Sequence, residues 1–291
     1  MTKFSGVGVA LVTPFHPNGE IDEASLRNVV DHVIDGGVDY LVALGTTSEA
    51  ATLSKNEREY VVNIITEHNG GRLPLVIGVG GNNTSQVVEE LRTLPYLRQG
   101  DAILSVTPYY NKPTQQGLYG HFSAIAEHSP LPVILYNVPG RTAVNMTAET
   151  TLRLANDFEN VIAVKEASGN LDQATEILRS KPEDFMLLSG DDSLTLPLIS
   201  MGASGVIAVV ANVLPCEFST LVHAAIEGEY AEAPEIHYRL SPLYKVLFEE
   251  GNPAGIKAAL HAKGVIESYE LRLPLCRASD ALYHKMAGMW R

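Results

Sequence analysis

One lysine is placed where covalent chemistry is feasible, at the end of a short apolar run. The run Val161–Val164 is rich in β-branched residues and bounded by polar ones, which predicts a strand buried on both faces. Burial at the strand end disfavours the charged ammonium, so Lys165 becomes available as an amine nucleophile toward a carbonyl substrate. The alternative is that Lys165 pairs with an acid such as Glu166 and only caps the sheet.

Other polar motifs also follow apolar runs. Thr46 and Thr47 stand in Gly-Thr-Thr-Ser-Glu, where backbone N–H groups and hydroxyls suit a carboxylate oxygen; an ordinary loop and helix entry is the alternative. Tyr109 and Tyr110 form a pair in Thr-Pro-Tyr-Tyr-Asn, and tyrosines in such a loop can simply pack.

A phenol and a guanidinium follow a fifth run. Tyr136 could move protons, and Arg141 could hold a carboxylate through two parallel hydrogen bonds. Asp191 and Asp192 follow a later run, and adjacent acids before a helix are expected to cap it. No clustered histidine or cysteine accompanies them, so we expect no metal site.

These motifs need a scaffold that brings strand ends together, and the hydrophobic pattern predicts one. Apolar β-type runs alternate with amphipathic helical stretches. Eight strand and helix units favour a (β/α)₈ TIM barrel, an α/β fold whose working residues gather at the C-terminal strand ends; an open doubly wound sheet is the alternative. The expected strands are Val7–Val12, Tyr40–Leu44, Leu75–Val79, Ala102–Val106, Val133–Tyr136, Ile162–Val164, Met186–Leu188 and Val206–Val210.

Start signals support the helices between these strands. Asp22 and a Ser54–Glu57 capping box open the first two, and the expected caps of later helices are Thr84, Thr114, Thr147 and Asn170. After Pro215 the pattern predicts helices without strands, at Glu217–Gly228, Ala231–Glu250, Pro253–Gly264 and Ala278–Met289. We therefore expect a catalytic barrel over residues 1–215 and a C-terminal helical extension over residues 216–291.

Composition excludes several classes of protein. The 291 residues are 45% hydrophobic with a net charge of −13, which indicates a globular protein and argues against nucleic-acid binding. A signal peptide and a membrane span are both lacking, so we expect a cytoplasmic location without a membrane partner. Cys216 and Cys276 are expected to be reduced. The glycine-rich stretch 78–83 lacks the third glycine of a dinucleotide loop.

Five motifs together resemble a known family. They are Gly45–Glu49, Thr107–Asn111, Tyr136–Thr142, Lys165–Asn170 and Ser189–Asp192, and they occur in the order and on the strands found in dihydrodipicolinate synthases, also called 4-hydroxy-tetrahydrodipicolinate synthases. The resemblance runs from about Phe4 into the C-terminal region. It implies a class I Schiff-base enzyme that condenses pyruvate with L-aspartate 4-semialdehyde to 4-hydroxy-tetrahydrodipicolinate, in the diaminopimelate route to lysine.

The resemblance also implies roles for the catalytic residues. Lys165 would form the imine with pyruvate, which lets the pyruvate methyl carbon lose a proton and attack the aldehyde. Tyr136 would move protons through Thr47 and Tyr110, with Tyr110 coming from a neighbouring subunit. A homotetramer built from two dimers is implied, and neither a cofactor nor a metal is required.

Substrate binding follows from the same resemblance. Backbone N–H groups of Thr46 and Thr47 would hold the pyruvate carboxylate, and Arg141 would hold the carboxylate of the semialdehyde. Gly190 and Ile207 would line the pocket, Ile207 through its carbonyl oxygen.

Two rival functions remain open. Related lyases such as N-acetylneuraminate lyase share the lysine, the tyrosine and the Gly-Thr-Thr type loop, but Arg141 favours a small aldehyde that carries a carboxylate. A barrel that binds pyruvate without turnover is the second rival; the complete set of proton-relay residues argues against it.

The chain departs from the family pattern at two places. Ser48 replaces the usual glycine, which we interpret as a tolerated variant. The positions that match the lysine-inhibition site are Ala50, Lys55, Arg58, Asn82, Gln86 and Tyr109. There Gln86 replaces a glutamate and Lys55 a histidine, so a carboxylate that would face the lysine ammonium is lost and a cation is added. We therefore expect weak or absent lysine feedback.

Overall fold

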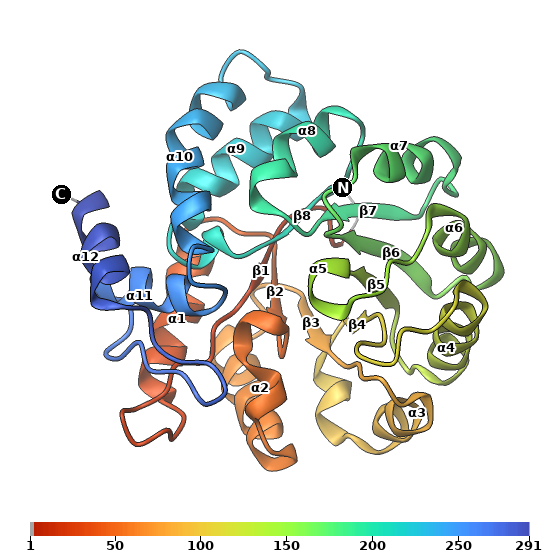
Figure 1. Ribbon diagram of the computed structural model, residues 1–291, viewed down its shortest axis with the longest axis horizontal. Helices are drawn as coiled ribbons and strands as arrows, with labels where there is room; N and C mark the ends of the chain where they lie inside the picture. Colours follow the sequence, from red (N-terminus) through yellow and green to blue (C-terminus); the bar gives the residue numbers. More distant parts are fainter. Residues whose placement is uncertain (1–2, 291) are drawn as a thin grey trace.

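Eight parallel strands close into a barrel in chain order, with β8 paired to β1 (Figure 1). The computed structural model of the chain describes residues 3–290. The (β/α)₈ prediction is confirmed, and each expected run overlaps one strand. The strands are β1 (Gly6–Ala10), β2 (Tyr40–Ala43), β3 (Leu75–Gly78), β4 (Ala102–Val106), β5 (Val133–Asn137), β6 (Val161–Glu166), β7 (Met186–Ser189) and β8 (Gly205–Ala208).

Helices surround the strands (Figure 1). Those that follow successive strands are α1 (Glu23–Asp35), α2 (Lys55–Asn69), α3 (Thr84–Thr93), α4 (Gln115–His128), the short α5 (Pro139–Thr142) with α6 (Ala148–Asp157), α7 (Leu171–Ser180), α8 (Thr195–Ser200) and α9 (Pro215–Glu227). Short 3₁₀ helices lie at η1 (Thr46–Ser48), η2 (Ala50–Thr52), η3 (Pro95–Gln99), η4 (Asp192–Leu194) and η5 (Val210–Asn212).

The last barrel helix begins where the sequence placed the domain boundary. Helix α9 packs against β1, α1 and α8, so it covers the barrel in the position of its eighth helix. Burial explains this placement, because Phe218, Leu221 and Val222 are fully covered in the core around the strands. The boundary expected between residues 215 and 216 falls inside this helix, and we propose that the extension starts after α9.

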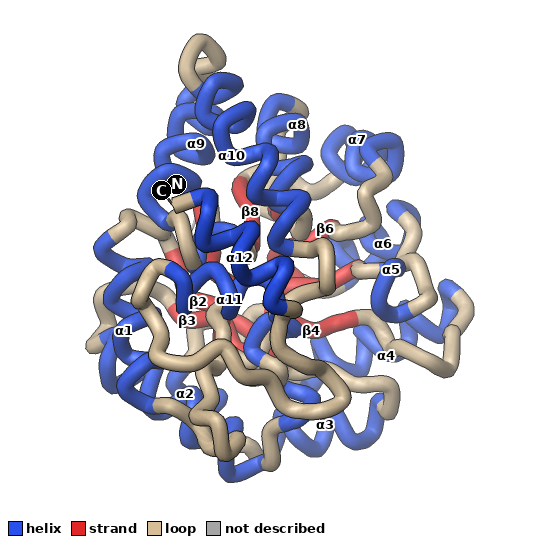
Figure 2. Tube along the Cα trace, turned by 60° about the vertical axis from the view of Figure 1, so that its left-hand side comes forward, coloured by secondary structure: helices blue, strands red, loops and turns tan. Residues whose placement is uncertain are grey.

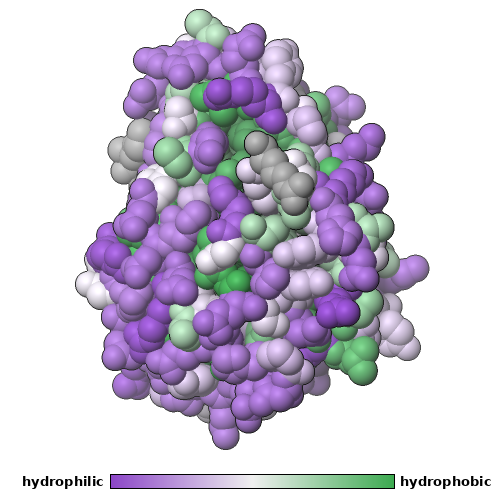
Figure 3. Space-filling model, turned by 90° about the vertical axis from the view of Figure 1, so that its left-hand side faces the viewer, coloured by the Kyte–Doolittle hydropathy of each residue, from purple (hydrophilic) through white to green (hydrophobic). Residues whose placement is uncertain are grey.

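The extension consists of α10 (Ala233–Leu247), α11 (Ala254–Ala262) and α12 (Asp280–Met289). These helices gather on one side of the barrel, which Figure 2 brings forward. The surface of this side is mainly hydrophilic, and hydrophobic residues show mostly in its hollows (Figure 3). Within residues 3–290, no helix is both long and apolar enough to cross a membrane.

Most of the predicted helix starts are confirmed. The side chains of Asp22, Thr114, Thr147 and Asn170 accept hydrogen bonds from first-turn backbone N–H groups, and Ser54 with Glu57 forms the capping box. Thr84 was the wrong cap for α3. Asn83 caps that helix instead, because its backbone is extended and its side chain accepts from Gln86 N, whereas Thr84 is already helical.

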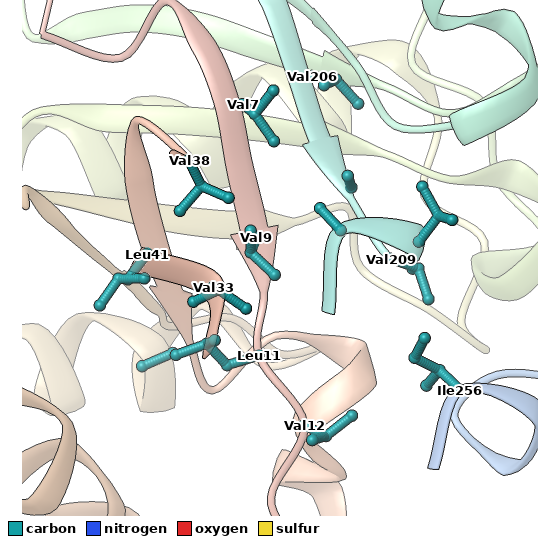
Figure 4. Close-up of a cluster of buried hydrophobic side chains, with 14 of the residues drawn as sticks. Val7, Val9, Leu11, Val12, Val33, Val38, Leu41, Val206, Val209 and Ile256 are labelled. Carbon is teal, nitrogen blue, oxygen red and sulfur yellow. The ribbon is translucent and has the colours of Figure 1, made fainter. Parts of the chain in front are cut away.

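The barrel separates two apolar layers, and strand alternation decides which side chains face each layer. Figure 4 shows part of the outer layer, where Val7, Val9 and Val206 lie beneath the helices. On β6, Ala163 belongs to the inner cluster and Val164 to the outer one. Lys165 therefore points into the barrel.

Candidate active site

Lys165 and Tyr136 are brought together by the register of two adjacent strands. Tyr136 of β5 is paired with Lys165 of β6, and both lie near the C-terminal ends of their strands. The Lys165 Nζ atom lies 4.4 Å from the centroid of the Tyr136 ring. The two residues are only 5% and 7% exposed, so the amine stands in an apolar, water-poor setting beside a phenol.

Glu166 does not serve as a partner for Lys165. Its carboxylate lies on the outer face of the strand, where Oε2 accepts from Gln173 Nε2 at 2.9 Å and Oε1 from the backbone N of Ser168 at 2.6 Å. Asn137 Nδ2 donates to Oε2 at 3.1 Å. The interpretation of Lys165 as a cap paired with Glu166 is therefore wrong.

Two adjacent acids follow β7 and behave differently. Asp191 caps η4 by accepting from Ser193 N, as predicted. Asp192 is buried instead, and it accepts from the backbone N of Val209 at 3.0 Å and of Val210 at 2.8 Å. Burial raises the pKa of Asp192 to about 6, although these N–H groups and Lys165 act in the opposite direction. No group of three or more His, Cys, Asp or Glu side chains in residues 3–290 could hold a metal ion.

The Gly-Thr-Thr-Ser-Glu segment forms the tight turn η1 after β2. Thr46 is exposed, whereas Thr47 is 2% exposed and its Oγ1 accepts from Asn252 Nδ2 at 3.0 Å. Ser48 donates its hydroxyl to Gly45 O at 2.8 Å. The backbone of Ser48 does not adopt a positive φ, so this position does not require the glycine usual in the family.

A cavity of about 400 Å³ opens at this end of the barrel. Its wall includes Thr46, Tyr136 and Arg141, which brings three of the predicted site residues to one space. That wall does not include Lys165, Gly190 or Ile207. Lys165 nevertheless lies against the ring of Tyr136, and Tyr136 is part of the wall. The wall also contains Leu44, Val106, Val138, Thr142, Asn252 and Leu275.

Arg141 lies on α5, a single helical turn that follows β5. Pro139 occupies the first position of this helix, where the missing N–H of proline costs nothing. The Arg141 Nη2 atom donates to the carbonyl oxygen of Asn252 at 3.4 Å. The rest of the guanidinium remains available at the cavity wall for a carboxylate.

Gly190 directly follows β7, and Ile207 lies on the neighbouring strand β8. A Cβ atom at Gly190 would stand 2.5 Å from the Ala167 Cβ, so the close approach of the chains requires glycine. Ile207 of β8 is 1% exposed and belongs to the inner cluster that also contains Tyr136.

The paired tyrosines do not share one environment. Tyr109 lines the cavity, and Asn82 Nδ2 donates to its carbonyl oxygen at 3.1 Å. Tyr110 is 87% exposed with a φ of 76°, a left-handed conformation that is rare for a bulky residue. A single chain therefore does not bring Tyr110 to Tyr136.

Only some of the positions matched to the lysine-inhibition site line the cavity. Ala50 and Arg58 line the cavity with Tyr109, whereas Lys55 and Gln86 are exposed and do not. Glu90, one turn beyond Gln86, is buried, lines the cavity and accepts from Gln86 Nε2 at 3.2 Å. A carboxylate that the sequence interpretation had not considered therefore faces this space.

The extension supplies further residues that sequence reasoning missed. Asn252 contacts both Thr47 and Arg141. The Lys257 Nζ atom lies 2.5 Å from Glu49 Oε1, and both side chains are fully buried. Burial lowers the pKa of Lys257 to about 8, although Glu49 opposes that change. The only signal for this region in the sequence was the Gly-Asn-Pro turn before α11, and a turn signal does not indicate a distant contact.

Comparisons with known proteins agree with the geometry. Residues 3–289 match the model of the dihydrodipicolinate synthetase family. The chain is 51% identical to the 4-hydroxy-tetrahydrodipicolinate synthase of Flavobacterium psychrophilum over 98% of this chain and 97% of that one. The dihydrodipicolinate synthase structure from Thermotoga maritima has a TM-score of 0.95 at 40% identity, over 99% and 97% of the two chains.

A structure described as the first monomeric dihydrodipicolinate synthase variant is also similar, with a TM-score of 0.93 at 40% identity over 99% and 96% of the two chains. The family model and these relatives extend over the barrel and the extension alike. The chain belongs to the dihydrodipicolinate synthetase family.

Proposed function

We propose that this chain condenses pyruvate with L-aspartate 4-semialdehyde through a Schiff base on Lys165, giving 4-hydroxy-tetrahydrodipicolinate for the diaminopimelate route to lysine. The observation that carries the proposal is a buried lysine against a phenol whose ring lines the same cavity as Arg141. This arrangement supplies an amine nucleophile, a proton carrier and a carboxylate clamp. No step needs a cofactor.

The chemistry begins with attack of the Lys165 amine on the pyruvate carbonyl, and water leaves as the imine forms. The protonated imine accepts the electron pair of a methyl C–H bond, whose proton is removed, and the resulting enamine forms a carbon–carbon bond to the aldehyde, whose oxygen takes up a proton. The amino group of the semialdehyde then attacks the re-formed imine carbon, which closes the ring and releases the Lys165 amine. Tyr136 carries protons in these steps, because its ring lies against the Lys165 amine.

We assign the relay hydroxyl next to Tyr136 to Thr46 in place of Thr47. Thr46 lines the cavity with Tyr136, whereas the Thr47 hydroxyl is buried against Asn252. Tyr110 enters the relay from a neighbouring copy, which its 87% exposure in the single chain supports. A homotetramer of paired dimers is the assembly we propose, although one similar structure is described as a monomeric variant.

The remaining residues bind the two substrates. Backbone N–H groups of Thr46 and Thr47 hold the pyruvate carboxylate, and Gly190 with the carbonyl oxygen of Ile207 shapes the space around it. Arg141 holds the carboxylate of the semialdehyde. We place the enzyme in the cytoplasm and propose weak or absent inhibition by lysine.

A turnover assay tests the function directly. Pyruvate is supplied with L-aspartate 4-semialdehyde in one arm and with N-acetylmannosamine in the other, and Lys165→Ala is the blank. We expect turnover of the semialdehyde alone, with at least a tenfold rise of its KM in Arg141→Leu because a charged clamp is lost. Turnover of the sugar would instead favour the sugar lyases. Pyruvate trapping without turnover of either aldehyde would favour a binding protein.

A further inference from the structure

The turn that carries Thr46 and Thr47 ends at a residue in an unfavourable backbone conformation. Glu49 has a φ of 57°, in the left-handed region that glycine usually occupies. Its backbone joins two turns, because Glu49 N donates to Thr46 O and Glu49 O accepts from the N and Oγ1 of Thr52. Such a conformation persists only where the surroundings hold it in place.

The side chain of Glu49 provides that support through a fully buried ion pair with Lys257. Oε1 accepts from Lys257 Nζ at 2.5 Å, and Oε2 accepts from the backbone N of Arg272 at 3.0 Å. Lys257 also donates to Glu270 O at 3.0 Å and lies 4.1 Å from the centroid of the Phe15 ring. Both carboxylate oxygens and the ammonium are therefore satisfied.

Stability alone does not account for this ion pair. Two charges without solvent contact are costly to bury, and well-packed apolar side chains of similar volume usually stabilise a core at least as well. What an ion pair adds is a fixed orientation of the two side chains. The Lys257 ammonium and the Arg272 N–H fix the carboxylate from two sides, and thereby fix the backbone of Glu49.

The same part of the extension also contacts the turn at Thr47. Asn252, five positions before Lys257, donates from Nδ2 to Thr47 Oγ1. The turn is thus held at Thr47 by Asn252, two positions before α11 begins, and at Glu49 by Lys257 inside α11. The two N–H groups proposed to bind pyruvate lie at the start of this held segment.

We propose that Lys257 is a positioning residue, which acts through Glu49 to set the backbone N–H groups of Thr46 and Thr47 for the pyruvate carboxylate. The inference rests on the proposed role of that turn in binding pyruvate. Lys257 is fully buried and does not line the cavity, and Arg141 is held through Asn252 and not through this pair. Loss of the pair therefore weakens pyruvate binding selectively.

The test separates the two substrates. Lys257→Met and Glu49→Gln are compared with the wild type for the KM of pyruvate, the KM of the semialdehyde and the pyruvate concentration that gives half-maximal borohydride trapping. We expect both pyruvate values to rise at least tenfold in each variant, while the KM of the semialdehyde changes less than threefold. The double variant should be no worse than either single variant, since both remove the same support.

Glu57→Gln is the matched control. Glu57 pairs with the Arg272 side chain beside the same turn but does not contact Glu49 through its own side chain. It should lower thermal stability and leave both pyruvate values within twofold. A wild-type pyruvate KM in either single variant would overturn the inference, as would an equal rise for both substrates. If Lys257→Met does not fold, Glu49→Gln decides. A wild-type protein that does not trap pyruvate at all would refute the proposed function itself.

Discussion

The two sides of the candidate site are held by different kinds of contact. On the sheet side, Tyr136 and Lys165 are neighbours because β5 and β6 pair in register. On the loop side, the turn ending at Glu49 depends on Lys257, 208 positions further along the chain. The comparison shows that one site can combine a candidate nucleophile, placed by backbone pairing, with a turn held by side chains from a distant part of the chain.

The difference extends to the buried charges. Glu49 has a full ion pair, whereas the Asp192 carboxylate behind the sheet side is held by backbone N–H groups of Val209 and Val210. Within residues 3–290 neither Asp192 nor Lys165 takes part in an ion pair. We therefore expect substitution of Lys165 or Tyr136 to impair the chemical step. Substitution of Glu49 or Lys257 should instead weaken substrate binding, because the turn is displaced.

The largest expected effect distinguishes the two buried lysines. Lys165→Ala should abolish turnover and the borohydride-stable pyruvate adduct, because no other amine lies beside Tyr136 in the described chain. Lys257→Met should still form the adduct at saturating pyruvate. Intact-protein mass spectrometry measures the adduct. An adduct that persists in Lys165→Ala would mean that the nucleophile lies elsewhere.

The second effect concerns the phenol. Tyr136→Phe keeps the ring against Lys165 but removes the proton carrier, so kcat should fall about 10²- to 10⁴-fold. Steady-state kinetics with both substrates measures the loss. A kcat within threefold of the wild type would exclude Tyr136 from proton transfer.

The third effect concerns stability, to which Lys257 should contribute more than Lys165. Lys257→Met leaves the Glu49 carboxylate buried and unpaired, and should lower the free energy of unfolding by about 3–5 kcal/mol. Lys165→Met, which breaks no ion pair, should change it by less than about 1.5 kcal/mol. Denaturant unfolding at one fixed protein concentration measures both. Equal losses would contradict the contrast between the two sides.

The fourth effect is a pH dependence on the sheet side. The raised pKa of Asp192, about 6, means that between about pH 6 and pH 4 the folded protein holds a proton that the unfolded chain has lost. The unfolding free energy of the wild type, relative to Asp192→Asn, should therefore rise as the pH falls through this window, by at most about 3 kcal/mol. Asp191→Asn is the matched control, and its difference from the wild type should not follow this course.

The smallest effect concerns lysine. Lys55 and Gln86 do not line the cavity, and the nearby Glu90 carboxylate is already bonded to Gln86, so lysine should not inhibit by half at submillimolar concentration. A titration of initial rates measures this. Strong inhibition that disappears in Glu90→Gln would show that Glu90 replaces the missing glutamate.

The strands, most helix caps and the candidate pair Lys165 and Tyr136 could be predicted from sequence. Each depends on residues close together along the chain: a β-branched run before Lys165, a Ser54–Glu57 spacing, a phenol at the end of a strand. Parallel strands in order then carry such residues to one end of a barrel without further information. Local patterns were enough for these features because the contacts that create them are local or follow from strand order.

Tertiary structure alone decided the rest. It assigned α9 to the barrel, turned Thr46 toward the cavity and Thr47 toward Asn252, and placed Glu90 at the cavity wall. It also joined Glu49 to Lys257. These outcomes depend on contacts between residues far apart in the chain, and such contacts leave no periodic signal. In the sequence, Lys257 resembles any other lysine of a helix, and only folding buries it against the carboxylate of Glu49.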